Sequence, residues 1–239
     1  MRLFTMESLL QSNLESWKKD AARKFSEKMR DRHHPFPCIP ATIGYQLDQF
    51  RYGFLPEPWD PETVSELANA LEAYSKQYRD LGSYTSLILF YKDHQLESKM
   101  VEDYEQIFWE HLTQVSHLDK FDWPKTIPTD PANTLWEFCF HNEQYFVYCG
   151  TPAHKNRQSR QFPYLMLAIT PRSVLVDFYS SQNRAAKIKS NIRKRLTNYD
   201  TAPIHPNLNT YGREDNYEWK QYFLRDDETT LSKCPFHRL

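Results

Sequence analysis

The sequence predicts an α+β fold, a single domain in which a mixed or antiparallel central sheet is flanked by helices. Two observations predict it. Some segments repeat apolar residues at three- or four-residue steps, which is typical of helices, and others are short apolar runs, which are typical of strands. The two kinds of segment interleave without the regular βαβ alternation of a doubly wound fold. The length of 239 residues fits one large domain, so we treat residues 1–239 as one unit.

The N-terminal part, residues 1–31, is predicted to be a helix that packs on the body of the protein. Its regularly spaced apolar residues are Leu10, Leu14, Trp17, Ala21, Phe25 and Met29. A proline-rich strip at residues 33–40 follows, which cannot join a central strand because proline lacks the backbone N–H. Beyond it, alternating apolar residues predict a strand within residues 41–54. The alternating residues are Ile43, Tyr45 and Leu47.

The central part of the chain predicts two helices with a strand between them. Asp60 fits the N-cap of the second helix, with Pro61 at its first helical position. Tyr84–Tyr91 is the most apolar run in the sequence and predicts a central strand. A third helix is predicted from Val101 to about His117, because apolar residues again recur at helical spacing.

The C-terminal half predicts a hairpin, one more strand and a fourth helix. Leu135–His141 and Glu143–Cys149 read as the two strands of a hairpin around Asn142. Tyr164–Ile169 is the next predicted strand. Ser181–Asn198 predicts a helix with a basic outer face, which we interpret as a solvated surface. The alternative interpretation is a docking face for an acidic electron-donor protein.

Composition excludes several classes of function. Thirty basic and 31 acidic residues give a formal charge of −1, so no general electrostatic attraction to nucleic acid or membrane is expected. The chain has only five glycines and no Gly-rich phosphate-binding run, which argues against nucleotide chemistry of those kinds. Its four cysteines form no CxxC pair. The N-terminus does not resemble a signal peptide, and we expect a cytoplasmic protein with reduced thiols.

A candidate site follows the predicted strand at residues 145–149, where the chain turns at residues 150–152. His154, Arg157 and Arg160 come directly after this turn. An imidazole can bind a metal through one ring nitrogen, and a guanidinium can bind a carboxylate through two hydrogen bonds. A ligand with a metal centre and pendant carboxylates would suit this set, and heme is the commonest such molecule. The alternative is a surface or capping histidine.

Several short motifs, in order and with matching spacing, resemble the YqcI/YcgG family over nearly the full chain. They are Phe36-Pro37-Cys38, the turn with Arg157 and Arg160 before Phe162, the helix end Arg193–Leu196, Asn207-Leu208, Tyr211-Gly212, Glu218–Tyr222 and Cys234-Pro235-Phe236. Some members of the wider group resemble heme-dependent N-oxygenases, which hydroxylate guanidine or amine nitrogens of amino-acid-like molecules. The resemblance implies heme b, a small cationic substrate, and an electron-donor protein or a small reductant. We expect no nucleic-acid or membrane partner and consider a homodimer as the assembly.

The sequence departs from the N-oxygenase pattern at both histidines of that pattern. In those relatives a histidine stands just before the proline of the turn, whereas this chain has Pro152 there and its histidine at position 154. Near the end of the strand at 164–169, Arg172 stands where the relatives have a second histidine. Three alternatives therefore stay open: His154 binds the iron in a shifted turn, His205 binds it, or this branch binds no heme.

The resemblance implies a role for each matched residue around a heme. His154 would bind the iron, with the opposite face open to oxygen, and Arg157 and Arg160 would hold the propionates. Cys149 is the alternative iron ligand if the iron is bound by cysteine.

The substrate would be held and deprotonated near the C-terminal end of the chain. Glu218 is the best-matched carboxylate to position the cation and accept its proton, and Asp215 is a weaker candidate. Three aromatic residues could stack on the guanidinium or the porphyrin, or simply fill the core: Tyr211, Trp219 and Tyr222. A second hypothesis is a non-catalytic heme- or small-ligand-binding protein, such as a sensor or carrier. A third is a metal-free fold that binds a small polar ligand.

Overall fold

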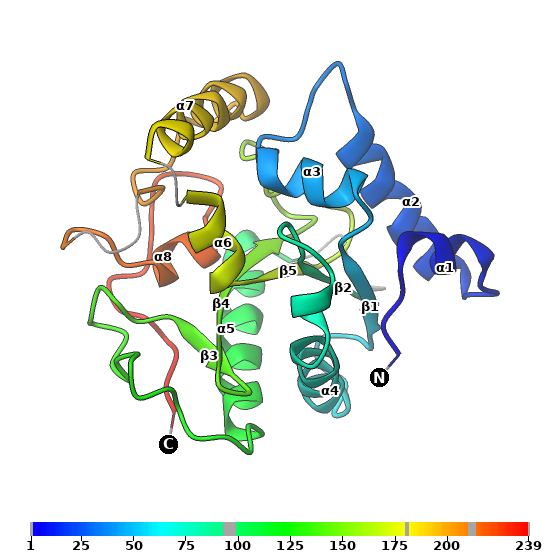
Figure 1. The fold of residues 1–239 in the computed structure, drawn as a ribbon, viewed down its shortest axis with the longest axis horizontal. Coiled ribbons are helices and arrows are strands. Elements are labelled where there is room, and N and C mark those ends of the chain that lie inside the picture. The colour runs from blue at the N-terminus through cyan, green and yellow to red at the C-terminus, as the bar shows by residue number, and fades with distance from the viewer. Residues whose placement is uncertain (1, 93–98, 180–181, 210–213, 239) are drawn as a thin grey trace.

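The centre of the protein is one open five-stranded sheet with the strand order β1-β2-β5-β4-β3 (Figure 1). The structure is a computed structural model that describes residues 2–92, 99–179, 182–209 and 214–238. The strands are β1 (Arg51–Leu55), β2 (Leu87–Tyr91), β3 (Phe138–Phe140), β4 (Glu143–Gly150) and β5 (Met166–Pro171). β1 and β2 are parallel and the other neighbours are antiparallel, which confirms the predicted α+β class with a mixed central sheet.

Helices cover both faces of the sheet. They are α1 (Met6–Gln11), α2 (Ser16–Arg30), α3 (Ile39–Gln46), α4 (Thr63–Ser75), α5 (Val101–His117), α6 (Arg172–Tyr179), α7 (Gln182–Tyr199) and α8 (Trp219–Tyr222), with a 3₁₀ turn at Tyr78–Asp80. In the described part of the chain, no helix is both long and apolar enough to cross a bilayer.

The core consists of two apolar clusters, one on each side of the sheet. Leu87 and Leu89 of β2 belong to the cluster that includes residues of α4, α5 and α8. Ile88 and Phe90 belong to the other, with Phe25 of α2 and residues of α3. Successive side chains of a strand point to opposite faces, so β2 is buried on both faces. This burial explains why the central strand appears in the sequence as one continuous apolar run.

The N-terminal third differs from the sequence prediction in two places. The predicted first helix is divided into α1 and α2, because the chain is extended at Ser12, the C-cap of α1. The strand predicted within residues 41–54 is wrong in its first half, where α3 begins at Ile39 with Pro40 in its first turn. Proline is tolerated there because the first N–H groups of a helix have no partner within the helix. Only β1 remains as a strand.

The predictions for the rest of the chain are closer to the structure. The predicted third helix agrees with α5, and the hairpin prediction is confirmed by β3 and β4. His141 and Asn142 have positive φ angles of 53° and 58°, as a two-residue hairpin turn requires. The second helix begins two residues later than predicted, at Thr63. The short helix α6 is not predicted by the sequence, because Pro171 is a signal for the end of regular structure.

Candidate functional site

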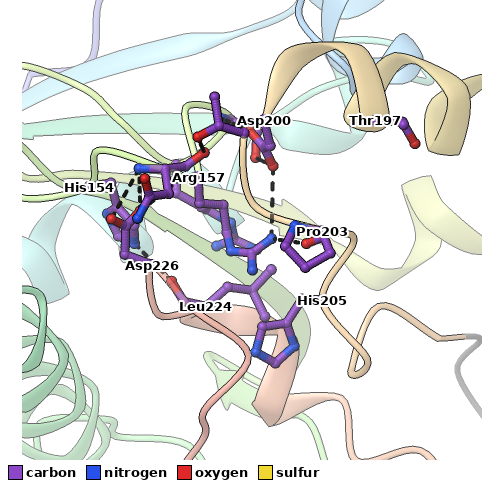
Figure 2. A network of polar contacts seen from close by, with 12 residues as sticks. His154, Arg157, Thr197, Asp200, Pro203, His205, Leu224 and Asp226 are labelled. Atoms are coloured by element: carbon purple, nitrogen blue, oxygen red, sulfur yellow. Dashed lines mark hydrogen bonds and ion pairs between the residues drawn. The ribbon is translucent and has the colours of Figure 1, made fainter.

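The turn between β4 and β5, residues 151–162, is held to residues 224–227 near the C-terminus by a dense polar network (Figure 2). The turn closes on itself where Thr151 N donates to Arg160 O at 2.9 Å and Phe162 N donates to Thr151 O at 3.0 Å. Three of the predicted site residues, His154, Arg157 and Arg160, lie within it. Each of them is at most 4% exposed, so their polar atoms need partners inside the protein.

Both ring nitrogens of His154 take part in hydrogen bonds within the chain. Nε2 lies 2.8 Å from Leu224 O, and Nδ1 lies 2.8 Å from the Thr151 hydroxyl. A carbonyl oxygen can only accept, so Nε2 carries the proton and Nδ1 accepts from Thr151. Burial lowers the pKa of His154 to about 4, which keeps the ring neutral. Neither nitrogen of this tautomer has a lone pair free for a metal ion.

The Arg157 guanidinium is surrounded by backbone carbonyl oxygens. Nε donates to Arg225 O at 2.9 Å, Nη2 to Asp227 O at 2.9 Å and Nη1 to Pro203 O at 3.2 Å. Asp200 adds a carboxylate 3.9 Å from Nη1, and Figure 2 shows the guanidinium directed between Asp200 and Pro203. Arg157 thus joins the turn to two other segments of the chain.

Arg160 fastens α8 to the end of β4. Nη1 donates to Tyr222 O at 2.7 Å and to Cys149 O at 3.2 Å, and Nη2 donates to Gln221 O at 2.7 Å. The guanidinium also lies over the Tyr148 ring, 4.2 Å from its centroid. All these contacts stabilise the fold, and the three hydrogen bonds use the N–H donors that a carboxylate ligand would need.

Two aspartates that sequence reasoning missed complete the network. The Asp226 carboxylate accepts from the backbone N–H groups of Lys155, Asn156 and Arg157 at 2.7 to 3.1 Å. Burial opposes the charged form of Asp226, but these N–H groups outweigh it and lower its pKa. Asp200 accepts from the N–H and hydroxyl of Ser159 at 2.6 and 2.8 Å. The sequence shows that residues 226–228 are acidic, but it does not show which N–H groups their carboxylates bind.

The residues at this turn do not fit heme b as they are arranged. His154 offers no free nitrogen, and both arginines already hold carbonyl oxygens. The alternative ligand His205 is also engaged, since its Nδ1 accepts from Asn207 N at 3.2 Å and its Nε2 lies 3.4 Å from Thr229 O. Among the described residues, no three or more His, Cys, Asp or Glu side chains are grouped to hold a metal ion.

A second polar cluster, formed by Glu137, Arg172 and Glu218, lies beside the sheet. Glu137 precedes β3, Arg172 is the first residue of α6, and Glu218 is the N-cap of α8. Arg172 Nε donates to Glu137 Oε2 at 2.6 Å, and Arg172 Nη2 pairs with Glu218 Oε2. Glu137 is 1% exposed and Glu218 is 4% exposed. Two buried carboxylates therefore bind one guanidinium.

Burial and the neighbouring charges together set the pKa values of this cluster. Burial raises the pKa of Glu218 to about 8, although the charge of Arg172 acts in the opposite direction, and the nearby Glu137 raises it further. Burial alone would lower the pKa of Arg172, but the charges of Glu218 and Glu137 outweigh burial and raise it. A carboxyl group with a pKa near neutrality can exchange a proton at physiological pH.

Aromatic residues of α8 form the surroundings of this cluster. The Tyr222 hydroxyl donates to Tyr145 O at 2.9 Å and accepts from Phe138 N at 3.2 Å, so it bridges β3 and β4 where the two strands part. Its ring is part of the core. The Trp219 ring lies 6.0 Å from the Trp109 ring, and its buried indole nitrogen has no hydrogen-bond partner. Trp219 follows Glu218 in the chain, so this unpaired donor belongs to the residue next to the carboxylate.

The structure thus divides the predicted site residues into two groups. His154, Arg157 and Arg160 lie together in the turn, whereas Glu218, Trp219 and Tyr222 belong to α8 and its cap. The predicted carboxylate Asp215 is exposed, and Tyr211 lies outside the described residues. Sequence reasoning missed Glu137 as a site residue. A single carboxylate inside the run WEFCF, at positions 136–140, was the signal that could have identified it.

The fold and the site define a one-sheet α+β protein in which two buried carboxylates, Glu137 and Glu218, bind the guanidinium of Arg172. The chain belongs to the YqcI/YcgG family, whose model matches residues 25–237. It is 44% identical over 232 residues to "Uncharacterized protein YqcI" and to "Uncharacterized protein YcgG", both of Bacillus subtilis (strain 168), covering 96% of this chain and 91% and 92% of the relatives. It is 27% identical over 230 residues to "Putative N(omega)-hydroxy-L-arginine synthase DcsA" of Streptomyces lavendulae. This match covers 94% of this chain and 85% of the relative. No solved structure matches the chain significantly.

Proposed function

We propose that this protein binds a small guanidine or amine compound at the Glu137–Glu218 pair and oxidises a nitrogen of that compound. The observation that carries the proposal is the pair of buried carboxylates that already binds a guanidinium, that of Arg172. A substrate cation would have to share these carboxylates with Arg172 or take its place. Support for the oxidation comes from the distant relative, whose name describes hydroxylation of an arginine nitrogen.

The reaction sets two requirements for the protein. Inserting one oxygen atom of dioxygen into an N–H bond gives N–OH and water; it consumes two electrons and two protons, and it needs a redox-active cofactor that would have to bind to the protein and activate the dioxygen. The nitrogen must also have a lone pair, so the bound cation must lose a proton to a nearby base. Glu218, whose pKa is raised to about 8, can accept that proton in its ionised form, so the reaction should be faster at weakly alkaline pH than at neutral pH. The electrons would come from a small reductant or from an acidic electron-donor protein bound to the basic face of α7.

The test of this function uses purified protein with dioxygen, a reductant and a panel of small guanidines and amines. Products heavier by one oxygen atom, labelled when ¹⁸O₂ is supplied, are expected by mass spectrometry. Glu218→Gln should lower product formation by about 10²-fold or more, as loss of a general base does. Glu228→Gln, which changes an exposed carboxylate in the same way, should leave it unchanged. If no panel compound gains oxygen under any reductant, the oxidation is refuted.

A second candidate function is non-catalytic binding of a small ligand. It is favoured by the internal bonding of His154, Arg157 and Arg160, because side chains bonded in this way leave no group at the turn to bind a cofactor that activates dioxygen. A hemin titration separates a structural turn from a heme-binding one. If the turn is only structural, His154→Ala and the parent protein give the same absorption spectra with hemin. If the Soret band instead shifts or weakens in His154→Ala, His154 binds heme, and the turn is a heme-binding site.

A further inference from the structure

A hollow of about 540 Å³ lies between α5 and the C-terminal segment, residues 225–237. Its α5 side is formed by residues that recur about once per helical turn from Glu102 to His117. Its other side includes Arg225 and His237. This volume lies in the range of small-molecule sites. None of the residues of the turn or of the Glu137–Glu218 pair lines it.

The charge of the lining favours a cation. Glu102, Glu105 and Glu110 contribute three carboxylates, and Arg225 contributes one guanidinium. Arg225 is already bound to Glu105, with Nη2 and Nε at 2.7 and 2.8 Å from Oε2. Glu102 and Glu110 remain at the exposed rim of the hollow. Carboxylates at the rim attract small cations and fix one end of a bound ligand.

Two buried polar atoms of the lining residues have no hydrogen-bond partner. They are Trp109 Nε1 and Thr113 Oγ1, from side chains that are 3% and 5% exposed. The two residues are four apart on α5, so they share the face that lines the hollow. Leaving such a group unpaired costs about 1–3 kcal/mol, and buried polar groups normally find a partner. An indole N–H can only donate, so its missing partner is an acceptor atom.

We propose that this hollow is a binding site for a small organic cation, an amine or guanidine that also carries a hydrogen-bond acceptor. Its cationic group would pair with one of the two rim carboxylates, Glu102 or Glu110, and its acceptor would meet Trp109 and Thr113 once their side chains turn toward the hollow. An organic ligand fits better than a metal ion, because the described residues contain no group of three or more ligating side chains placed to hold one. Binding at this hollow is independent of the proposed oxidation.

The binding test is isothermal titration of the full chain with L-arginine, agmatine, L-lysine and putrescine, and with magnesium chloride as an inorganic cation. At least one organic cation with an acceptor should bind saturably, and magnesium should not compete with it. The double variant Glu102→Gln/Glu110→Gln should weaken binding about tenfold or more. The matched control Glu62→Gln/Glu66→Gln, which makes the same charge change at the N-cap and in the first turn of α4, should bind as the parent does.

A second variant separates a ligand-binding role from a structural one. Thr113→Val keeps the shape of the side chain and removes a hydroxyl that has no partner, so the melting temperature without ligand should stay the same or rise. Its affinity for the organic cation should fall by about threefold or more. The proposal is overturned if no organic cation binds, if magnesium competes equally, if both double variants lose binding alike, or if Thr113→Val destabilises the protein while binding normally. Saturable binding without oxidation supports this site and counts only against the proposed function.

Discussion

Arg160 illustrates what the buried cations of the turn do. Its guanidinium binds three carbonyl oxygens that lie outside the ladders of the sheet, two from α8 and one from β4. Buried carbonyl groups that no N–H of a helix or strand reaches need another donor. An arginine provides five N–H groups in one rigid fork, so one side chain can satisfy several carbonyls at once.

Replacing Arg160 by leucine should therefore act on stability. We expect the free energy of unfolding to fall by about 3 kcal/mol or more, because several buried carbonyls lose their donor at once. Urea denaturation of the purified variant measures this. If Arg160 instead serves mainly to hold a cofactor carboxylate, Arg160→Leu would unfold at the parental urea concentration.

Glu218 should make stability depend on pH in an unusual direction. Its pKa is about 8 in the folded protein, against 4.5 as the ordinary value. Between these values the folded state binds a proton that the unfolded state has released. The stability that Glu218 contributes is therefore fully present below about pH 4.5 and is lost as the pH rises to about 8. A difference of one between the folded and unfolded pKa values corresponds to about 1.4 kcal/mol in the free energy of unfolding.

We expect Glu218→Gln to remove this dependence. The parent protein should lose more stability between about pH 5 and pH 8 than the variant does, measured by urea unfolding at both pH values. His154 acts in the opposite direction, because its lowered pKa of about 4 reduces stability as the pH falls below its ordinary value of 6.5. The comparison of variant with parent cancels this second contribution. Equal pH profiles would show that Glu218 ionises normally.

Sequence reasoning at this scale identified residue types better than partners. His154, Arg157, Arg160 and Glu218 are all buried and bonded, which is unusual for such polar residues. Their partners lie far away in the chain, as when Asp226 binds Arg157 N across 69 positions. No local pattern encodes a contact of that range, so a buried structural network could not be distinguished from a cofactor site.

Among the α-helices that the structure describes, α8 is the shortest, yet it has a central structural role. The Tyr222 hydroxyl joins β3 to β4 by taking the place of a ladder hydrogen bond. Tyr222→Phe keeps the ring and leaves Phe138 N and Tyr145 O without this partner. We expect a loss of about 1–3 kcal/mol in the free energy of unfolding, measured by chemical denaturation. An unchanged stability would mean that the hydroxyl is dispensable to the hairpin.

Elements with strong internal periodicity are predictable, and those set by tertiary contacts are not. α5 and the hairpin carry their own signals, apolar spacing and a two-residue turn. The prediction for α3 is wrong because its apolar residues alternate over a few positions, as strand residues do. Its position depends on Gly44, where an added Cβ would lie 2.2 Å from Tyr84 O. That close approach to a segment 40 residues later is invisible in a local window.

In the whole molecule, the polar network joins the turn, the end of α7 and the C-terminal segment into one unit. Asp226→Ala removes the acceptor of three backbone N–H groups at once. We expect faster hydrogen exchange at residues 155–157 and in the C-terminal segment, with β1 and β2 unchanged, because proteins open in local cooperative units. Mass spectrometry of peptides from exchanged protein would show this. Uniformly faster exchange across the sheet would contradict a local unit.

The strand order has a consequence for how the chain is made. β5 is the last strand in sequence, yet it lies between β2 and β4 and supplies the hydrogen bonds that join the two halves of the sheet. Until residues 166–171 leave the ribosome, a nascent chain can form only the β1–β2 pair and the β3–β4 hairpin of this sheet, each with an unpaired edge. Such edges are templates for pairing with other chains. Ribosome stalling before Met166 should therefore yield aggregation-prone products, whereas stalling after Pro171 should not.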